Sequence, residues 1–307
     1  MRYPWLFLSF ALLTFACKTD APDAAEVVDV SDVDSDAAVP PVEPVAYSVW
    51  NTGTAPESVS INGAVVYVAH LGDAVDPTSK DGDGYIAVYD ANGTLVDTLA
   101  EGLNAPKGTV VAGRTLFVAD VDHLVGINTT TGEKTIDISF EGQTSYLNGL
   151  TRGISDVLYV SATDAGKIWR VVPRTKSVEE VAELPGVNGL SYDQKRKAIY
   201  AVQYLQDDPT GGHVYLVDAE TGAMRQEGDY GGMLDGAMLR GGTFYFTDWA
   251  GGGAGKVLAL DVATRATRVV AEDEQFSGPA NFDVLGDGLA LIPMLTGSKV
   301  VAVPLGR

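Results

Sequence analysis

The chain has 307 residues, a single cysteine and a formal net charge of −20 at pH 7. This acidic surplus excludes nucleic acid as a partner, because binding nucleic acid requires a basic surface that neutralises phosphates. The chain is long enough to bury a sizeable core as one domain, and it needs no disulfide to do so.

The first sixteen residues predict an export signal. Arg2 precedes an apolar stretch, residues 5–16, which is too short to span a bilayer and suits a signal peptide. Cys17 follows in a context that resembles a bacterial lipoprotein processing site, although Thr14 and Phe15 depart from the usual leucine and small residue. Its position favours lipidation over a buried structural thiol. Acylated Cys17 would anchor the protein to a lipid bilayer of the bacterial cell envelope, at the periplasmic face or the outer membrane.

Residues 17–46 begin with this cysteine and continue as an acidic spacer. The spacer is rich in Asp, Ala, Val and Pro, contains eight acids against one lysine, and shows no sustained apolar period. Such a composition predicts disorder. Residues 1–46 carry two basic and eight acidic side chains, which leaves residues 47–307 with a net charge of −14.

A repeat with a period of 40 to 50 residues runs through residues 47–307. Each unit opens with a polar residue at the start of a short apolar strand; the six are Glu57, Lys107, Asn148, Asn188, Asp235 and Asn281. Several short strands in each such unit are typical of a β-propeller, whose four-stranded blades surround a channel. We therefore expect an all-β fold, a six-bladed propeller of antiparallel blades, and a monomer.

The remaining strands follow in each unit. Second strands are expected at residues 65–68, 116–118, 158–160, 199–201, 244–246 and 289–292, and third strands at 85–89, 123–128, 167–173, 213–218, 256–261 and 299–304. Turns at Asn92-Gly93, Thr131-Gly132 and Thr221-Gly222 lead to fourth strands at 94–99, 134–140 and 223–227, and two further fourth strands are expected at 177–184 and 267–271. Residues 47–50 supply the outer strand of the sixth blade, so the ring closes through its two ends.

The first strand of every blade lines the channel, so the six polar residues should converge on one mouth. Carboxylate and amide oxygens, as in Glu57, Asn148, Asn188 and Asp235, are hard ligands that suit Ca²⁺ better than Zn²⁺. The structural alternative is that Asn and Asp before Gly are ordinary turn formers, and that Lys107 neutralises Glu57 from the next blade.

Two other motifs do not match a known site. The glycine-rich run at residues 250–257 lacks the Ser or Thr after the lysine of a phosphate-binding loop, and we expect a loop between the second and third strands of blade five. The stretch Asp81-Gly82-Asp83-Gly84 begins like a calcium loop but has no glutamate at the twelfth position.

The order of the polar residues resembles the senescence-marker-protein, gluconolactonase and regucalcin-like family of six-bladed propellers. The best local matches are Val187-Asn188-Gly189-Leu190-Ser191-Tyr192-Asp193, Leu234-Asp235-Gly236-Ala237-Met238 and Tyr245-Phe246-Thr247-Asp248-Trp249. The resemblance implies one divalent cation, Ca²⁺, held by Glu57, Asn188 and Asp235, with Asp235 also the catalytic base of lactone hydrolysis. It places Asn148 near the ion and the substrate. Ser58-Val59 departs from the Gly-Pro that usually follows the family's blade-one glutamate.

Two classes of function follow from these patterns. One is a metal-dependent lactonase or esterase that acts on a small lactone or ester, with Lys107, Asn148 and Asn281 as substrate-binding residues and Lys107 recognising an anionic group. The other is a non-catalytic binding propeller of the cell envelope, because the segments that end at Asp120 and Asp248 also resemble NHL and YWTD propellers. These two aspartates are alternatively simple loop caps.

Overall fold

A computed structural model describes residues 47–273 and 276–306. All of the described residues belong to one compact unit, which spans Ala46–Arg307. The predicted signal peptide at residues 1–16, Cys17 and the spacer to residue 46 therefore lie outside the described residues. No helix in the described part of the chain is long and apolar enough to cross a membrane.

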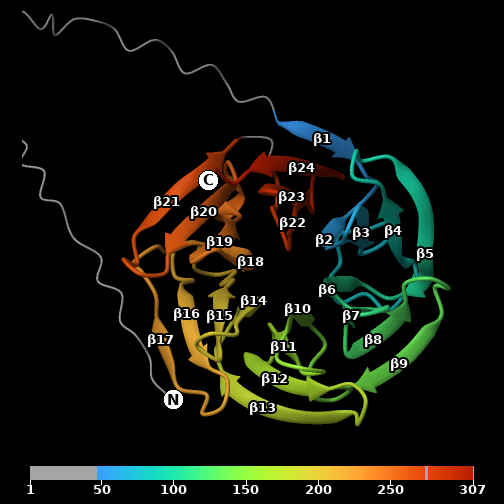
Figure 1. The fold of residues 1–307 in the computed structure, drawn as a ribbon, viewed down its shortest axis with the longest axis horizontal. Helices are drawn as coiled ribbons and strands as arrows, with labels where there is room; N and C mark the ends of the chain where they lie inside the picture. Colours follow the sequence, from blue (N-terminus) through green and yellow to red (C-terminus); the bar gives the residue numbers. More distant parts are fainter. Residues whose placement is uncertain (1–46, 274–275, 307) are drawn as a thin grey trace, which may run out of the picture. The chain divides into compact units, whose positions relative to one another are not determined.

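Six four-stranded antiparallel sheets form a six-bladed β-propeller, and Figure 1 shows the blades following one another around a common axis. The first three blades contain, in order, β2 (Pro56–Asn62), β3 (Val65–His70), β4 (Gly84–Tyr89) and β5 (Leu95–Leu103); β6 (Pro106–Ala112), β7 (Thr115–Asp120), β8 (His123–Asn128) and β9 (Lys134–Ser139); and β10 (Leu147–Arg152), β11 (Leu158–Ala162), β12 (Lys167–Val172) and β13 (Ser177–Glu183).

Blades four and five contain β14 (Val187–Asp193), β15 (Ala198–Gln203), β16 (Val214–Asp218) and β17 (Met224–Gln226), then β18 (Leu234–Arg240), β19 (Thr243–Asp248), β20 (Lys256–Asp261) and β21 (Thr267–Glu272). The sixth blade contains β22 (Asp283–Leu285), β23 (Leu289–Met294), β24 (Lys299–Pro304) and β1 (Ser48–Asn51). The expected fold class is therefore confirmed.

The ring closes through β1, as predicted. This strand pairs antiparallel with β24 and places Trp50 opposite Val300. Trp50 is buried, and its indole packs against the Tyr89 ring and covers Gly93 in the first blade. Gly93 has a φ of 83°, which favours glycine in the turn before β5. The closing strand thus contacts both the last blade and the first.

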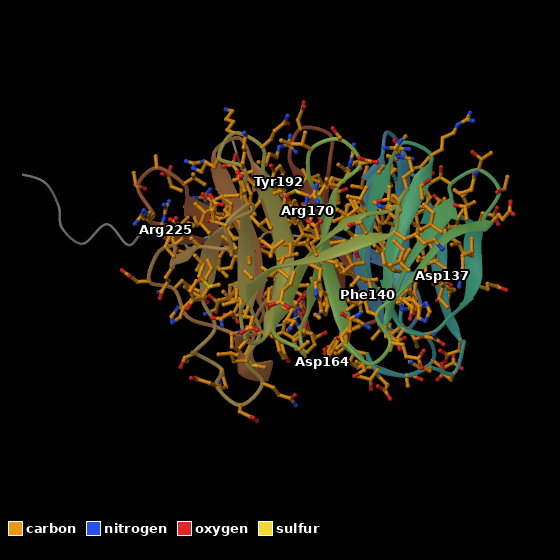
Figure 2. The ribbon with its side chains drawn as sticks, turned by 90° about the horizontal axis from the view of Figure 1, so that it is seen from below. Asp137, Phe140, Asp164, Arg170, Tyr192 and Arg225 are labelled. Atoms are coloured by element: carbon orange, nitrogen blue, oxygen red, sulfur yellow. The ribbon has the colours of Figure 1, made fainter. Side chains whose placement is uncertain are left out.

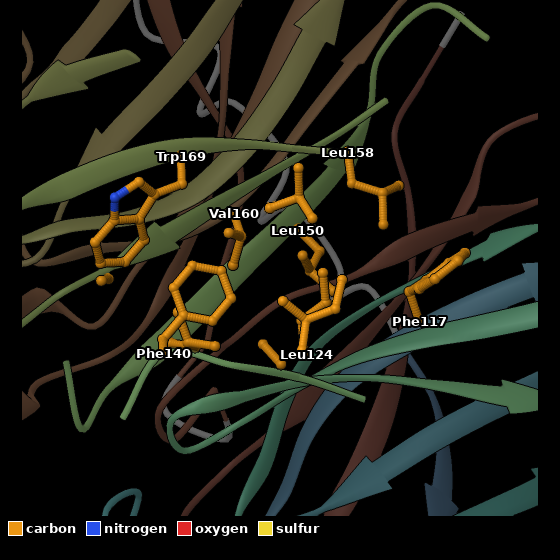
Figure 3. Close-up of a cluster of buried hydrophobic side chains, with 12 residues drawn as sticks. Phe117, Leu124, Phe140, Leu150, Leu158, Val160 and Trp169 are labelled. Atoms are coloured by element: carbon orange, nitrogen blue, oxygen red, sulfur yellow. The ribbon is translucent and has the colours of Figure 1, made fainter. Parts of the chain in front are cut away.

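Hydrophobic side chains fill the spaces between neighbouring blades. One such cluster joins Phe117 and Leu124 of blade two to Leu150, Val160 and Trp169 of blade three, and Figure 3 shows these side chains packed together. Strands β7 and β11 contribute almost wholly buried side chains, as expected for sheets that are covered on both faces. The blades therefore hold the channel-lining strands in fixed positions.

Strand bounds differ from the sequence expectations mainly in the outer strands. β5 extends to Leu103, four residues beyond the predicted end, and β17 is shortened to three residues. The side chains of β5 and β17 are mostly exposed or half-buried, so their apolar pattern is weak and their ends are poorly marked in the sequence. β22 is also short, and Asn281 lies two residues before it rather than at its start.

Candidate functional site

In blades one to five, the polar residue near the start of the inner strand lies at a break in strand register. The pairing shifts between Pro56 and Ser58 in blade one, and the corresponding shifts in blades two to five lie between Pro106 and Thr109, Leu147 and Leu150, Val187 and Leu190, and Leu234 and Ala237. A bulge of this kind can redirect a side chain out of the ordinary alternation of a strand. Five of the six predicted residues line one pocket of about 810 Å³: Glu57, Lys107, Asn148, Asn188 and Asp235.

The glycines after these polar residues allow neighbouring inner strands to approach closely. A Cβ atom on Gly149 would lie 2.4 Å from the Asn188 carbonyl oxygen, and one on Gly189 would lie 2.1 Å from the Asp235 carbonyl oxygen. Both glycines lie within strands and neither has a positive φ. The interpretation of Asn-Gly and Asp-Gly as turn formers is therefore wrong here, because backbone contact between blades is what requires glycine.

Glu57 and Asp235 are two buried carboxyl groups of this pocket, at 3% and 4% exposure. Burial raises the pKa of Asp235 to about 7, although hydrogen bonds from Trp249 and Asn188 act in the opposite direction. Burial also raises the pKa of Glu57 well above its usual range; the charge of Asp235 raises it further, while Lys107 and Asn281 lower it. Two carboxyl groups in one site therefore oppose each other's ionisation.

Three oxygen atoms of this site have no hydrogen-bond partner among the described residues: Glu57 Oε2, Asn188 Oδ1 and Asp235 Oδ1. All three belong to buried side chains that line the pocket. Leaving a buried polar atom unpaired costs about 1–3 kcal/mol, so a built group of such atoms needs a ligand or a functional reason. Oxygen ligands of this kind fit a hard divalent cation.

Among the described residues, no group of three or more His, Cys, Asp or Glu side chains could hold a metal. A cation at the mouth would therefore depend on amide oxygens as well as on Glu57 and Asp235. Asn188 supplies such an oxygen, and its amide also acts on Asp235 through a hydrogen bond. Such a donor set would consist of two carboxylates and at least one amide.

Lys107 is buried at 1% exposure, and its ammonium group is held by the protein itself. Its Nζ atom donates to the carbonyl oxygens of Pro77 at 2.6 Å and Ala105 at 2.9 Å, and it lies 5.1 Å from the centre of the Tyr146 ring. No ion pair within 4.0 Å joins it to Glu57 in the described residues. The predicted neutralisation of Glu57 by Lys107 therefore involves no direct ion pair, although the charge of Lys107 does lower the pKa of Glu57. Burial lowers the pKa of Lys107 to about 8, while Glu57 raises it.

Asn281 and Asn148 connect the ring. The Asn281 amide donates to Glu57 Oε1 at 3.3 Å and to Asn148 Oδ1 at 3.5 Å. Asn148 in turn donates to Thr163 Oγ1 at 3.2 Å. Backbone bonds between Asn281 and the first blade complete the contact, from Asn281 N to Glu57 O and from Val59 N to Asn281 O. All six predicted residues thus meet at one end of the propeller.

Three aromatic pocket residues were missed by the sequence reasoning: Tyr146, Tyr204 and Trp249. Trp249 Nε1 donates to Asp235 Oδ2 at 3.1 Å, and its ring meets Tyr204 edge to face at 5.3 Å. Burial and the charge of Asp235 raise the pKa of Tyr204 to about 12. Tyr146 directly precedes the inner-strand segment of blade three, and Trp249 directly follows β19. Their positions directly beside strands of the repeat are the signal by which the sequence could have indicated these residues.

Two long loops flank the pocket from opposite blades. Residues 71–83 connect β3 to β4 in blade one, and residues 204–213 connect β15 to β16 in blade four; Figure 1 places these blades on opposite sides of the ring. The first loop contributes Leu71, Val75 and Pro77 to the pocket, and the second contributes residues 204–208. Figure 2 shows Asp164 of the pocket and Tyr192 of β14 near opposite faces of the propeller, so the mouth occupies one face only.

Asp120 and Asp248 cap loops. Asp120 accepts bonds from Asn104 N and Ala105 N, and Asp248 accepts bonds from Met233 N, Ala250 N and the Tyr230 hydroxyl. Each aspartate fixes the chain just before the inner strand of its own blade. The glycine-rich run lies between β19 and β20 as predicted, and the Asp81 stretch lies in the loop before β4.

No family model matches the chain, and no curated protein matches it. Several solved structures, however, are similar to it in fold. A protein of unknown function from Bacteroides thetaiotaomicron has a TM-score of 0.64 at 13% identity, over 82% of this chain and 70% of that one. A catalytically inactive virginiamycin B lyase from Staphylococcus aureus, solved with quinupristin, has a TM-score of 0.56 at 13% identity, over 84% and 99%.

TolB from Acinetobacter baumannii has a TM-score of 0.55 at 16% identity, over 79% of this chain and 63% of that one. At these identities the likenesses show the propeller fold alone. The resemblance to the gluconolactonase family therefore stays a prediction, as do the metal site, the lipid anchor and the catalytic roles.

Proposed function

We propose that this protein is a metal-dependent hydrolase of small lactones or esters, anchored to the bacterial cell envelope through acylated Cys17. The observation that carries the proposal is the set of three unpartnered oxygens of Glu57, Asn188 and Asp235 in one pocket. Glu, Asn and Asp also follow one another along the blades in the order that carries the resemblance to the gluconolactonase family. Cys17 lies outside the described residues, so the anchor rests on the sequence alone.

Glu57, Asn188 and Asp235 would hold the cation, and Ca²⁺ suits their oxygens best. When bound, a divalent cation would supply a Lewis acid that polarises the carbonyl group of a lactone or ester. The two carboxyl groups have pKa values raised by burial. A positive charge beside the two carboxyl groups would lower these pKa values and favour the ionised carboxylates.

Asp235 is the proposed general base. Trp249 donates to its Oδ2 atom and fixes the carboxylate, which would take a proton from the water molecule that attacks the carbonyl carbon and pass it to the alkoxide oxygen of the broken C–O bond. Burial raises the pKa of Asp235 to about 7, and a cation beside it would lower that pKa and keep the carboxylate ionised, as a general base requires.

Lys107, Asn148 and Asn281 are the proposed substrate-binding residues. Two N–H groups of Lys107 are held by carbonyl oxygens, so its position is fixed, and the ammonium can stabilise the negative charge that forms on the substrate. The anionic group that Lys107 is predicted to recognise would thus be the negative charge that forms at the reacting end of the substrate. Asn148 and Asn281, joined by their own hydrogen bond, position Glu57 and the substrate.

Turnover with and without a chelator tests the proposal. The wild type should hydrolyse members of a panel of lactones and aryl esters, lose the activity in chelator and regain it with Ca²⁺. Asp235→Asn should lose most of the turnover, whereas Asp97→Asn on the exposed outer strand of blade one should not. Calcium binding without turnover on any member would instead support the alternative, a non-catalytic binding propeller.

A further inference from the structure

The walls of the pocket carry far more negative than positive charge. Its carboxyl groups belong to Glu57, Asp164, Asp207, Asp208 and Asp235, and its one ammonium group belongs to Lys107. Even if a divalent cation were bound by Glu57, Asn188 and Asp235, the five carboxyl groups would be opposed by only three positive charges, two from the cation and one from Lys107. A cleft lined by one sign of charge concentrates ligands of the opposite sign.

Part of this negative charge lies at the rim and is not neutralised. Asp207 and Asp208 are exposed on the loop of residues 204–213, and none of the ion pairs in the described residues includes either one. Among the described residues, the Asp208 carboxylate accepts bonds only from its own turn, from Thr210 N and Thr210 Oγ1 at 3.2 Å each. An acidic rim alone would not indicate a ligand, but Glu57 and Asp235, which line the same pocket, also carry buried oxygens without a hydrogen-bond partner among the described residues.

Aromatic rings accompany these aspartates. Tyr204 begins the acidic loop and meets Trp249 edge to face, and both rings are half-buried in the pocket wall. Val75, on the opposite loop, lines the same pocket with 49% of its surface exposed. Aromatic faces next to carboxylates bind organic cations, because the ring quadrupole and the charge both attract an ammonium group. The apolar wall accommodates the alkyl groups of such a cation.

We propose that the pocket binds an organic cation, with its ammonium group between the rings of Tyr204 and Trp249 and the carboxylates of Asp207 and Asp208. This inference rests on the proposed function and deepens it: the substrate is a lactone or ester that carries an ammonium group away from its carbonyl. The reacting end lies toward Lys107 and the floor, and the charged end lies toward the rim. Charge thus selects both the ligand and its orientation.

Three probes of nearly the same shape test the inference by calorimetry on the protein in excess Ca²⁺. They are choline, its uncharged isostere 3,3-dimethylbutan-1-ol, and the anion 3,3-dimethylbutyrate. Choline should bind at least tenfold more tightly than the alcohol, and the anion should bind least. Equal affinities, tighter binding of the anion, or no binding of any probe would overturn the inference.

Variants locate the charge that is responsible. The double variant Asp207→Asn and Asp208→Asn should weaken choline binding about three- to tenfold and leave the alcohol unchanged, and Tyr204→Leu should also weaken choline. Asp97→Asn removes the same type of charge from the exposed outer strand of blade one and should change neither affinity. An equal effect of Asp97→Asn would show general charge attraction rather than a site, which contradicts the inference.

Two outcomes separate this inference from the proposed function. If choline binds as expected but choline acetate is not hydrolysed, the cation site stands and the hydrolase fails. If choline acetate and 3,3-dimethylbutyl acetate are hydrolysed with equal kcat/KM, the hydrolase stands and the cation site fails.

Discussion

Glu57 and Asp235 share a buried site, and their raised pKa values predict how stability depends on pH. In the protein without metal, Asp235 has a pKa of about 7 against 3.8 for the ordinary group, so the folded state binds its proton more tightly than the unfolded state. The free energy of unfolding should therefore fall as pH rises from about 4 to 7, on the order of 1 kcal/mol per pH unit from this group.

His70 acts in the opposite direction over an overlapping range. Burial lowers its pKa from 6.5 to about 4, which makes the free energy of unfolding rise with pH in that window. The measurement is therefore the difference between wild type and Asp235→Asn in denaturant melts with chelator, since His70 is common to both. The wild type should lose stability relative to Asp235→Asn between pH 4 and 7. If the free energies of unfolding of the two proteins change in parallel with pH, the pKa of Asp235 is not raised in the folded state.

Gly189 gives a second test, because it lies where the strands that carry Asn188 and Asp235 approach each other. A methyl group there would sit 2.1 Å from the Asp235 carbonyl oxygen, so Gly189→Ala should push the two strands apart. Overpacking of this kind costs about 1–3 kcal/mol, and it should weaken calcium binding as well. Gly253→Ala is the matched control, since its nearest backbone atom lies 3.2 Å away in a loop. Equal melting temperatures for the two variants would contradict close contact between the strands.

The closing strand β1 fixes the two ends of the ring through one large side chain. Trp50 is 7% exposed, whereas Val49 on the same strand is 41% exposed. Trp50→Ala should cost about 3–5 kcal/mol in thermal or denaturant unfolding, because it removes a buried indole between blades six and one. Val49→Ala should change stability by about 0.5 kcal/mol or less. Similar losses from both would mean that closure does not depend on Trp50.

The sequence predicted those strands in which the same kind of residue recurs at the same place in every blade. The inner strands were found because a polar residue recurs at the start of each repeat unit, and β1 was found because blade six lacked a fourth strand. Tyr204 and the loop of residues 204–213 were not found, since a loop that occurs at this length in only one or two blades leaves no period to detect. The role of Gly149 and Gly189 was also misjudged, because contacts between blades have no local signature.

Lys107 shows a similar limit at the level of contacts. Its place in the ring followed from the repeat, but its partners are carbonyl oxygens of Pro77 and Ala105 that any residue type could supply. Sequence can indicate where a charged side chain lies, whereas backbone partners depend on how a neighbouring loop folds.

The whole protein is expected to be tethered, and Cys17 carries that expectation. Cys17→Ser removes the only cysteine and should abolish acylation, so the protein should move from the detergent phase to the aqueous phase in phase partitioning. Mass spectrometry of the mature N-terminus provides the control for processing. Partitioning that does not change would rule out the lipid anchor and leave the propeller site unaffected.

Calcium titration by calorimetry tests the central claim, that six blades bring their polar residues together to hold a divalent cation. The wild type should bind one Ca²⁺ per chain, and a hundredfold excess over the dissociation constant should raise the free energy of unfolding by about 2.7 kcal/mol. Glu57→Gln and Asp235→Ala should weaken or abolish the binding heat, while Asp97→Asn should retain it. No binding heat and no stabilisation of the folded wild type by Ca²⁺ would contradict the account.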